Sequence, residues 1–196
     1  MEAFIFYSVI LLWITQFITL FALFLLFRQF GEVYLSTGAG ISKDGLPVGR
    51  PFPAEVKVLS LDFNNPAAMA SFMEEGKPAL ITFISPNCKP CLRLLDDWNE
   101  AFTVYGDQIN FFTVIVGEET EVTHLADTYS FSGCRLWDRH KELFNRCLIR
   151  VTPFAFAVDE KGLITDKGLC GNKKQIELLA FSVLDLRQTG GKEGFK

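Results

Sequence analysis

The segment SPNCKPCLRLL, residues 85–95, constrains the fold of this chain more than any other. It carries Cys88 and Cys91, two residues apart, directly after the apolar run at 78–85. A continuous apolar run of this length is typical of a strand buried on both faces of a sheet. The residues over 91–102 then repeat their apolar side chains at helical spacing. The chain must therefore place a cysteine pair where a buried strand passes into a helix.

A metal site is one use of such a pair. Structural zinc takes four nitrogen or sulfur ligands, usually from a second closely spaced pair. The other cysteines and the histidines stand alone in the sequence, at Cys134, Cys147, Cys170, His124 and His140. A copper-chaperone site needs fewer ligands, since both cysteines and either histidine could form it. A purely structural disulfide is a third use, but so short a loop constrains little of the unfolded chain.

A redox centre accounts better for the surroundings of the pair. Cys88 falls at the start of the expected helix, where free N–H groups and the helix dipole favour a thiolate. Lys89 adds a positive charge, and Pro90 suits the first turn because it has no N–H to leave unbonded. Cys91 comes one turn later, within reach of a mixed disulfide formed at Cys88. We therefore interpret the pair as a dithiol that cycles with its disulfide.

The rest of the chain predicts an α/β fold, with a mixed central sheet flanked by helices. Residues 51–188 are expected to form this domain, and 152–168 are expected to form a hairpin that turns at 159–162. The other expected strands are at 56–63, 78–85 and 109–117, with a short one near 134–138. The expected helices are at 91–102, 120–129, 139–148 and 173–186.

The first 30 residues predict a transmembrane anchor. Residues 3–27 contain no charged side chain, and about 20 apolar residues are enough to cross a bilayer. The run is longer than the apolar part of a signal peptide, and no basic segment precedes it. We therefore expect one transmembrane helix that contacts the lipid bilayer through residues 3–27. Residues 31–50 are expected to be a linker and a loop leading into the domain, and 189–196 a flexible tail.

Charge gives limited information about orientation and partners. Arg28 and Lys43 lie after the apolar run and weakly favour a cytoplasmic domain. Long domains are translocated largely regardless of such charges, and disulfides persist outside the cytoplasm. We therefore expect a single-pass protein of the cell membrane with its domain on the extracytoplasmic side. The net charge of -4, with no basic run beyond Lys173–Lys174, predicts no nucleic-acid partner.

Two motifs together resemble a known family. GKPALITFISPNCKPCLRLL is similar to the active-site stretch of thioredoxin-fold oxidoreductases, and more narrowly to membrane-anchored TlpA/ResA-type proteins and to the MauD proteins of methylamine utilisation. VTPFAFAVDEKGLI, residues 151–164, resembles the family's proline-led strand and hairpin. The resemblance implies that Pro153 is cis and faces the cysteine pair, and that Thr152 meets the substrate backbone. The long spacing between the motifs implies an extra strand and helix, as in the TlpA type.

The sequence departs from this family pattern at positions that matter for proton transfer. Thr82 stands near the place where plain thioredoxin has a buried acid. Leu94 and Leu95 occupy the stretch where TlpA/ResA-type proteins often have an acid. Asp96 and Asp97 come later and are expected to face solvent. No residue is therefore assigned to assist proton transfer.

Together, these features predict a membrane-anchored thiol-disulfide oxidoreductase without a cofactor. Its partners would be proteins with thiols or disulfides and a membrane redox partner that relays electrons. Cys88 would exchange with the substrate and Cys91 would resolve the mixed disulfide. A copper chaperone, a thiol peroxidase using Arg150 and a redox-inactive scaffold are the alternatives. Cys134 and Cys147 could form a second disulfide or remain buried free thiols.

Overall fold

The computed structural model describes residues 6–25 and 44–190, and for 186–190 it describes the backbone alone. The chain divides into two compact units, Met1–Ser42 and Lys43–Lys196. Most of the predicted linker and the last six residues of the predicted tail lie outside the described residues. In the first unit, Phe6–Leu25 is a helix that is long and apolar enough to cross a membrane, a test that a signal sequence also passes.

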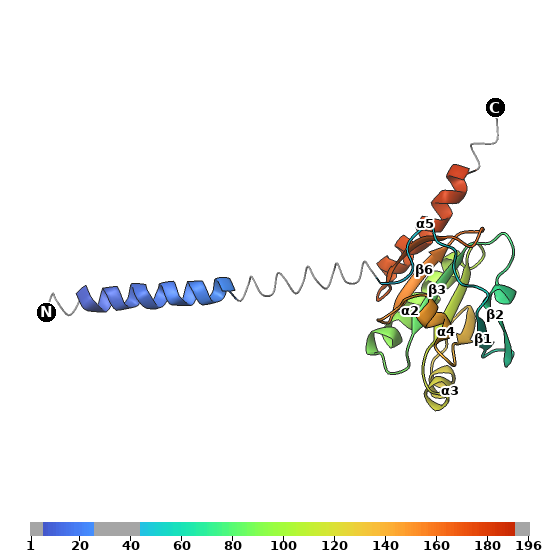
Figure 1. The fold of residues 1–196 in the computed structure, drawn as a ribbon, viewed down its shortest axis with the longest axis horizontal. Helices are drawn as coiled ribbons and strands as arrows, with labels where there is room; N and C mark the ends of the chain where they lie inside the picture. Colours follow the sequence, from blue (N-terminus) through green and yellow to red (C-terminus); the bar gives the residue numbers. More distant parts are fainter. Residues whose placement is uncertain (1–5, 26–43, 191–196) are drawn as a thin grey trace. The chain divides into compact units, whose positions relative to one another are not determined.

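The second unit is built on a seven-stranded sheet in the order β2-β1-β5-β4-β3-β6-β7 (Figure 1). Its central strand β3 pairs in parallel with β4 and antiparallel with β6, so the sheet is mixed as predicted. The strands are β1 (Lys57–Ser60), β2 (Asn65–Ala68), β3 (Ala79–Ile84), β4 (Asn110–Ile115), β5 (Cys134–Trp137), β6 (Phe154–Val158) and β7 (Ile164–Leu169).

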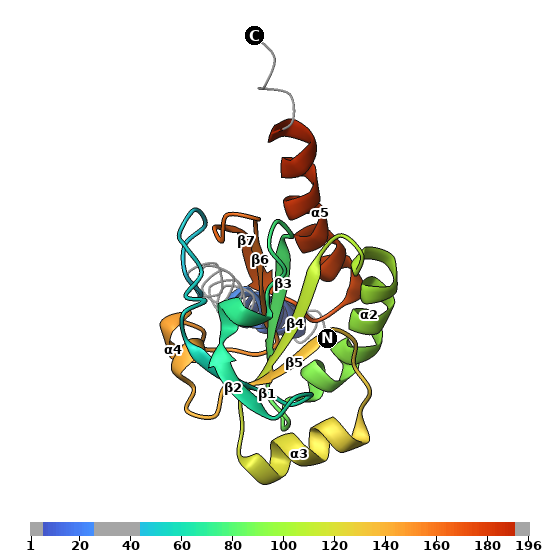
Figure 2. The same ribbon diagram turned by 90° about the vertical axis from the view of Figure 1, so that its right-hand side faces the viewer.

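Helices cover both faces of this sheet (Figure 2). They are η1 (Met69–Phe72), α2 (Lys89–Tyr105), α3 (Glu119–Thr128), α4 (Glu142–Arg146) and α5 (Lys173–Gly190). Side chains of α2, α3 and α5 form one buried cluster with one face of the sheet, centred on Trp98. Side chains of η1 and α4 pack with Phe83, Phe154 and Phe156 in a second cluster on the other face. All six residues of β3 are buried because both faces of this strand are covered.

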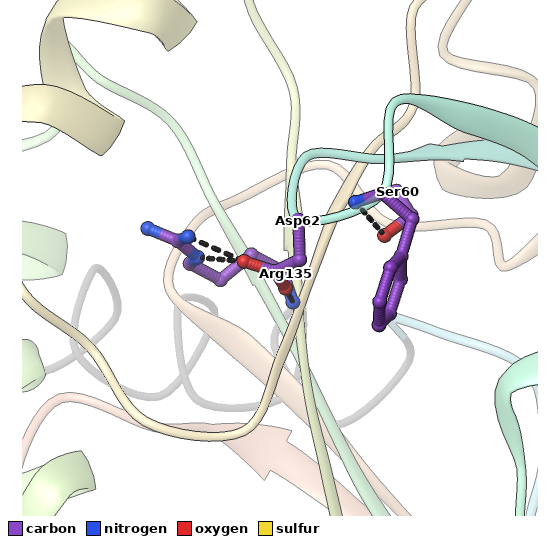
Figure 3. Close-up of polar contacts among 4 residues, drawn as sticks. Ser60, Asp62 and Arg135 are labelled. Carbon is purple, nitrogen blue, oxygen red and sulfur yellow. Dashed lines mark hydrogen bonds and ion pairs between the residues drawn. The ribbon is translucent and has the colours of Figure 1, made fainter.

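An ion pair links the turn after β1 to the neighbouring strand β5 (Figure 3). The Arg135 guanidinium donates to the Asp62 carboxylate, through Nε at 2.7 Å and also through Nη2. The Ser60 hydroxyl accepts from the backbone N–H of Phe63 at 3.3 Å, which holds the turn after β1. Both charged side chains are about 30% exposed, so the pair contributes specificity of pairing more than stability.

The short helix α4 is stabilised at its start by a buried carboxylate. Asp138 follows β5 and is 2% exposed. Its two oxygens accept from the backbone N–H groups of Glu142 at 2.9 Å and Phe144 at 2.8 Å. Burial raises the pKa of Asp138, while these N–H groups favour its charged form and oppose the rise.

The predicted elements are present, with differences in extent. α4 spans five residues instead of the expected ten, while α5 continues through Gly190. The strand β2 was not predicted, because its sequence NPAA has little strand character. It forms at the sheet edge by pairing with β1, where Pro66 is tolerated because an edge strand has N–H positions without partners.

Candidate functional site: a disulfide at the start of α2

Cys88 and Cys91 form a disulfide at the point where β3 leads into α2. Cys88 is the N-cap of the helix, and its Sγ accepts from the backbone N–H of Cys91 at 3.2 Å. Cys88 is half-buried whereas Cys91 is fully buried. The more accessible member of the pair is therefore the one whose sulfur faces the helix N-terminus, where negative charge is favoured.

Lys89 and Pro90 form the exposed first turn of α2, as the sequence predicted from their positions. Pro90 sits where the helix has no acceptor for a backbone N–H, so the missing donor does no harm. Lys89 is exposed and directly follows Cys88 in the chain. Its effect on the Cys88 thiol remains a prediction.

The second motif lies against the disulfide. The peptide bond between Thr152 and Pro153 is cis, as the resemblance implied, and it leads directly into β6. The Thr152 carbonyl oxygen is 3.4 Å from Cys88 Sγ. A disulfide sulfur carries no hydrogen, so this is a contact in the oxidised state, and the reduced Cys88 thiol can donate to the same oxygen. On the far side, the backbone N–H of Cys170 donates to the Pro153 carbonyl at 3.1 Å.

The segment before the cis peptide bond is held by the first residues of the domain. The backbone N–H of Gly45 donates to the Leu148 carbonyl at 3.1 Å, and the Arg150 guanidinium donates to the buried Asp44 carboxylate. Lys167 Nζ, on β7, donates to the carbonyls of Asp44 at 2.6 Å and Gly45 at 2.7 Å. Asp44 and Gly45 therefore hold the segment that leads into the cis peptide bond, and Lys167 ties these two residues to β7.

Comparison with solved structures identifies this architecture. The thioredoxin domain of a thiol-disulfide oxidoreductase from Bacteroides vulgatus superposes with a TM-score of 0.59 at 19% identity, over 69% of this chain and 99% of that chain. A secreted Mycobacterium tuberculosis disulfide oxidoreductase homologous to E. coli DsbE gives a TM-score of 0.55 at 17% identity, over 66% of this chain and 96% of that chain. The fold is that of the thioredoxin-like thiol-disulfide oxidoreductases.

Sequence comparison adds a narrower likeness. The chain is 26% identical over 176 residues to a methylamine utilization protein MauD of Methylophilus methylotrophus, covering 88% of this chain and 81% of the relative. No family model matches the chain. The alignment extends beyond the thioredoxin-like domain, because the domain alone does not account for 88% of the chain.

The inserted segment of the thioredoxin-like domain agrees with the TlpA-type resemblance. Between the cysteine pair and Pro153 the chain runs from α2 through β4, α3, β5 and α4. The resemblance implied an extra strand and helix in this interval, and β5 and α4 are the elements present there. β5 extends the sheet beyond β4 and pairs with β1 on its other side. β5 and α4 are therefore added beyond β4 without separating the two motifs, which meet at the disulfide.

The remaining cysteines of the thioredoxin-like domain are free thiols, so the second disulfide is not formed. Burial raises the pKa of Cys134 to about 11 and that of Cys170 to about 12, with nearby carboxylates adding to both rises. Burial also raises the pKa of Cys147 strongly. Such thiols are almost entirely protonated at neutral pH and are therefore poor nucleophiles.

The alternative sites considered from the sequence are not assembled around the disulfide. Within 6–25 and 44–190 there is no group of three His, Cys, Asp or Glu side chains placed to bind a metal ion. His140 is exposed, and His124 is exposed on α3. Arg150, the residue considered for a thiol peroxidase, has its guanidinium on Asp44.

Two threonine hydroxyls are buried under the site. Thr82 on β3 and Thr113 on β4 are aligned partners in the parallel pair, and they are 1% and 0% exposed. They lie on the sheet face that carries Leu80 and Ile84, the same face against which Cys91 packs. Neither hydroxyl has a hydrogen-bond partner among the described residues. The Thr82 hydroxyl therefore forms no polar link to the cysteines among the described residues.

Asp97 has a role that the sequence did not predict. It was expected on a solvated face, but it is half-buried and accepts from the backbone N–H of Lys173 at 2.9 Å. It therefore stabilises the start of α5 from the middle of α2. Asp96 is exposed as expected.

A cavity of about 460 Å³ adjoins the disulfide on the side of α3. Asn87, the residue before Cys88, forms part of its wall and donates through Nδ2 to Glu121 of α3 at 2.7 Å. The cavity is lined by Pro86, Asn87, Leu92, Thr120, Glu121, His124, Leu125 and Tyr129. Sequence reasoning missed it because its two walls come from helices separated by β4.

Proposed function

We propose that the chain is a membrane-anchored thiol-disulfide oxidoreductase that acts on extracytoplasmic protein substrates through Cys88 and Cys91. The observation that carries this proposal is the disulfide at the N-terminus of α2 in contact with the Thr152 carbonyl. The thioredoxin-like fold and the MauD relatives support an oxidoreductase activity.

The exchange needs no cofactor. In the reducing direction, the Cys88 thiolate attacks one sulfur of a substrate disulfide, and the other substrate sulfur leaves as a thiolate. The Cys91 thiolate then attacks the Cys88 sulfur, which releases the second substrate thiolate and leaves the Cys88–Cys91 disulfide. Two electrons pass from the protein to the substrate, and the reverse sequence oxidises a substrate dithiol. The half-buried Cys88 is accessible enough to meet the substrate, while the buried Cys91 is shielded from a competing attack.

Thr152 and Pro153 are proposed to dock the substrate backbone beside Cys88. The contact of the Thr152 carbonyl with the Cys88 sulfur places this loop within one residue of the exchange. Lys89 and the helix start are proposed to lower the Cys88 pKa, and Pro90 to keep the first turn in place.

The helix Phe6–Leu25 is proposed to anchor the chain in the membrane with the domain outside the cytoplasm. A membrane redox partner would then return the cysteine pair to its working oxidation state. The relatives named methylamine utilization protein support a role in maturing a protein of that process. Protease treatment tests the orientation. An extracytoplasmic domain is digested in cells whose cytoplasmic membrane is still intact but whose outer layers admit the protease, whereas a cytoplasmic domain is digested only after lysis.

Redox titration of the full chain in mild detergent tests the activity. The cysteine pair is equilibrated with glutathione or dithiothreitol buffers and read by thiol alkylation. A reversible two-electron transition is expected, and a value near -270 mV would indicate a reductase whereas one near -120 mV would indicate a disulfide donor. Absence of such a transition would refute the proposal.

Single-cysteine variants test the order of attack. Cys91→Ser is expected to accumulate mixed disulfides with substrate proteins, because the resolving thiol is gone, whereas Cys88→Ser is not. Cys134→Ser serves as the matched control and is expected to behave as the unaltered chain, since its thiol is half-buried and protonated. Hydrogen peroxide consumption by the reduced chain tests the thiol peroxidase alternative.

A further inference from the structure

The exchange chemistry uses the cysteines and the Thr152–Pro153 loop but not the cavity between α2 and α3. We propose that this cavity binds an arginine or lysine side chain that flanks the reacting cysteine of the substrate protein. The inference rests on the proposed function and specifies the substrate class of the same site.

The position of the cavity fits a residue near the substrate cysteine. Asn87 and Cys88 are neighbours in the chain, so the cavity wall begins about 3.8 Å in Cα spacing from the reacting residue. Leu92, one turn beyond Cys88 on α2, continues the wall. A substrate segment bound to Cys88 through its own cysteine therefore has a neighbouring side chain within reach of the cavity.

The lining suits a long side chain with an apolar stem. Apolar surface is supplied by Pro86, Leu92, Leu125 and the ring of Tyr129, of which Leu125 is almost fully buried. Arginine and lysine place their methylene groups along such a surface while the charged end meets a polar partner. The volume of about 460 Å³ lies within the usual range of small-ligand sites, so such a side chain fits with room for its backbone.

Glu121 supplies the partner for the charged end. It is half-buried on α3, where Oε1 accepts from Asn87 at 2.7 Å and Oε2 accepts a longer bond from the Glu118 N–H at 3.4 Å. A carboxylate can accept about four hydrogen bonds, so it retains capacity for a guanidinium or an ammonium group. The bond from Asn87 also fixes the carboxylate toward the cysteine loop.

The charges around the cavity favour a cation. Glu121 faces it from α3, and of the described residues that line it none is lysine or arginine. Arg139 lies near the start of α3 but donates to Glu119 at 3.4 Å. Lys89, on the first turn of α2, is exposed and is not part of the lining. His124 also lines the cavity and adds a polar group to it.

The test uses the full chain in mild detergent, reduced and freed of reductant. It is mixed with one of two disulfide-linked peptide homodimers that differ at a single residue two positions from the cysteine, arginine in one and glutamine in the other. Because both halves of each dimer are identical, attack on either sulfur gives the same products. The second-order rate of Cys88–Cys91 oxidation is read by quenched alkylation. The arginine peptide is expected to react about two- to fivefold faster, and the preference is expected to shrink as salt is added.

Variants assign the preference to the carboxylate. Glu121→Gln keeps one oxygen, which can accept the shorter bond from Asn87, but removes the charge, so the ratio of the two rates is expected to fall toward one. With Glu121→Lys, a third peptide that carries glutamate at the same position is expected to react faster than the arginine peptide. Glu75→Gln makes the same change in net charge at an exposed residue before β3, at the opposite end of that strand from the disulfide, and is expected to keep the ratio.

Equal, measurable rates for the two peptides with the unaltered chain would overturn the inference and leave the proposed function standing. The same holds if Glu121→Gln keeps the full preference. If the chain exchanges with neither peptide and its cysteine pair shows no reversible transition in redox buffers, the proposed function fails and the inference fails with it.

Discussion

Replacing Thr82 and Thr113 by valine is expected to stabilise the domain. Both hydroxyls are buried in the sheet under the cysteine pair, at 1% and 0% exposure, and neither has a partner in the described protein. A buried hydroxyl without a hydrogen bond costs roughly 1–3 kcal/mol relative to one in water, as mutational data indicate. Valine has nearly the same shape and an equal preference for strands. Each substitution should therefore raise the free energy of unfolding by about 1 kcal/mol.

The assay is urea unfolding of the full chain in mild detergent with the disulfide intact, followed by circular dichroism. With an m-value of about 2 kcal/mol/M, a gain of 1 kcal/mol moves the midpoint upward by about 0.5 M. Thr165→Val is the matched control in the same sheet, because its hydroxyl donates to the Ala157 carbonyl at 3.2 Å. This control should lose about 0.5–1.5 kcal/mol instead.

A double-substitution cycle decides whether the two hydroxyls are independent. If they are, the gains add. The reasoning is refuted if each single valine lowers stability by about 1 kcal/mol and the double variant loses no more than one single does. That pattern would mean that the two hydroxyls bond to each other or to a shared water in solution.

Three further predictions follow from burial and backbone geometry. Since burial raises the Cys170 pKa to about 12, iodoacetamide should label reduced Cys88 in the folded chain long before Cys170, and comparable labelling of both residues would contradict this. For the same reason, the free energy of unfolding should fall as the pH rises from about 8.5, where the unfolded Cys170 thiol ionises, towards 12. Asp138→Asn should lower stability by about 1–3 kcal/mol in urea unfolding, because one N–H in the first turn of α4 loses its acceptor; an unchanged midpoint would show that the N–H finds another. Gly133→Ala should cost more than Gly162→Ala in thermal unfolding, since both have positive φ but only the first would place Cβ 2.5 Å from a β4 carbonyl, and equal losses would indicate that the loop before β5 yields.

Local sequence signals were sufficient for the elements that carry the chemistry. The apolar runs of β3 and β4 are short and flanked by turn residues, which favours buried strands, and Pro90 after Cys88 predicts where α2 begins. The placement of Pro153 beside Cys88 and Cys91 came from the family resemblance of two motifs, and the structure has Thr152, the residue before it, in contact with Cys88.

Features that depend on partners distant in sequence could not be read in this way. β2 forms because β1 offers it a free edge, and nothing in NPAA itself favours a strand. Asp97 looks like an ordinary solvated helix residue until α5 is packed beside α2. The cavity near the disulfide has the same origin, since Glu121 faces Asn87 only after β4 has carried the chain across the sheet.

The attachment of the domain's first residues has a mechanical consequence. A pull on the chain ahead of Asp44 would be borne first by the bonds from Gly45 to Leu148, from Arg150 to Asp44 and from Lys167 to the two carbonyls. These bonds end on the segment that leads into the cis peptide bond and on β7, an edge strand of the sheet. Tension would therefore be delivered to the loop that touches the disulfide, so the reactive end of the domain would also carry the force.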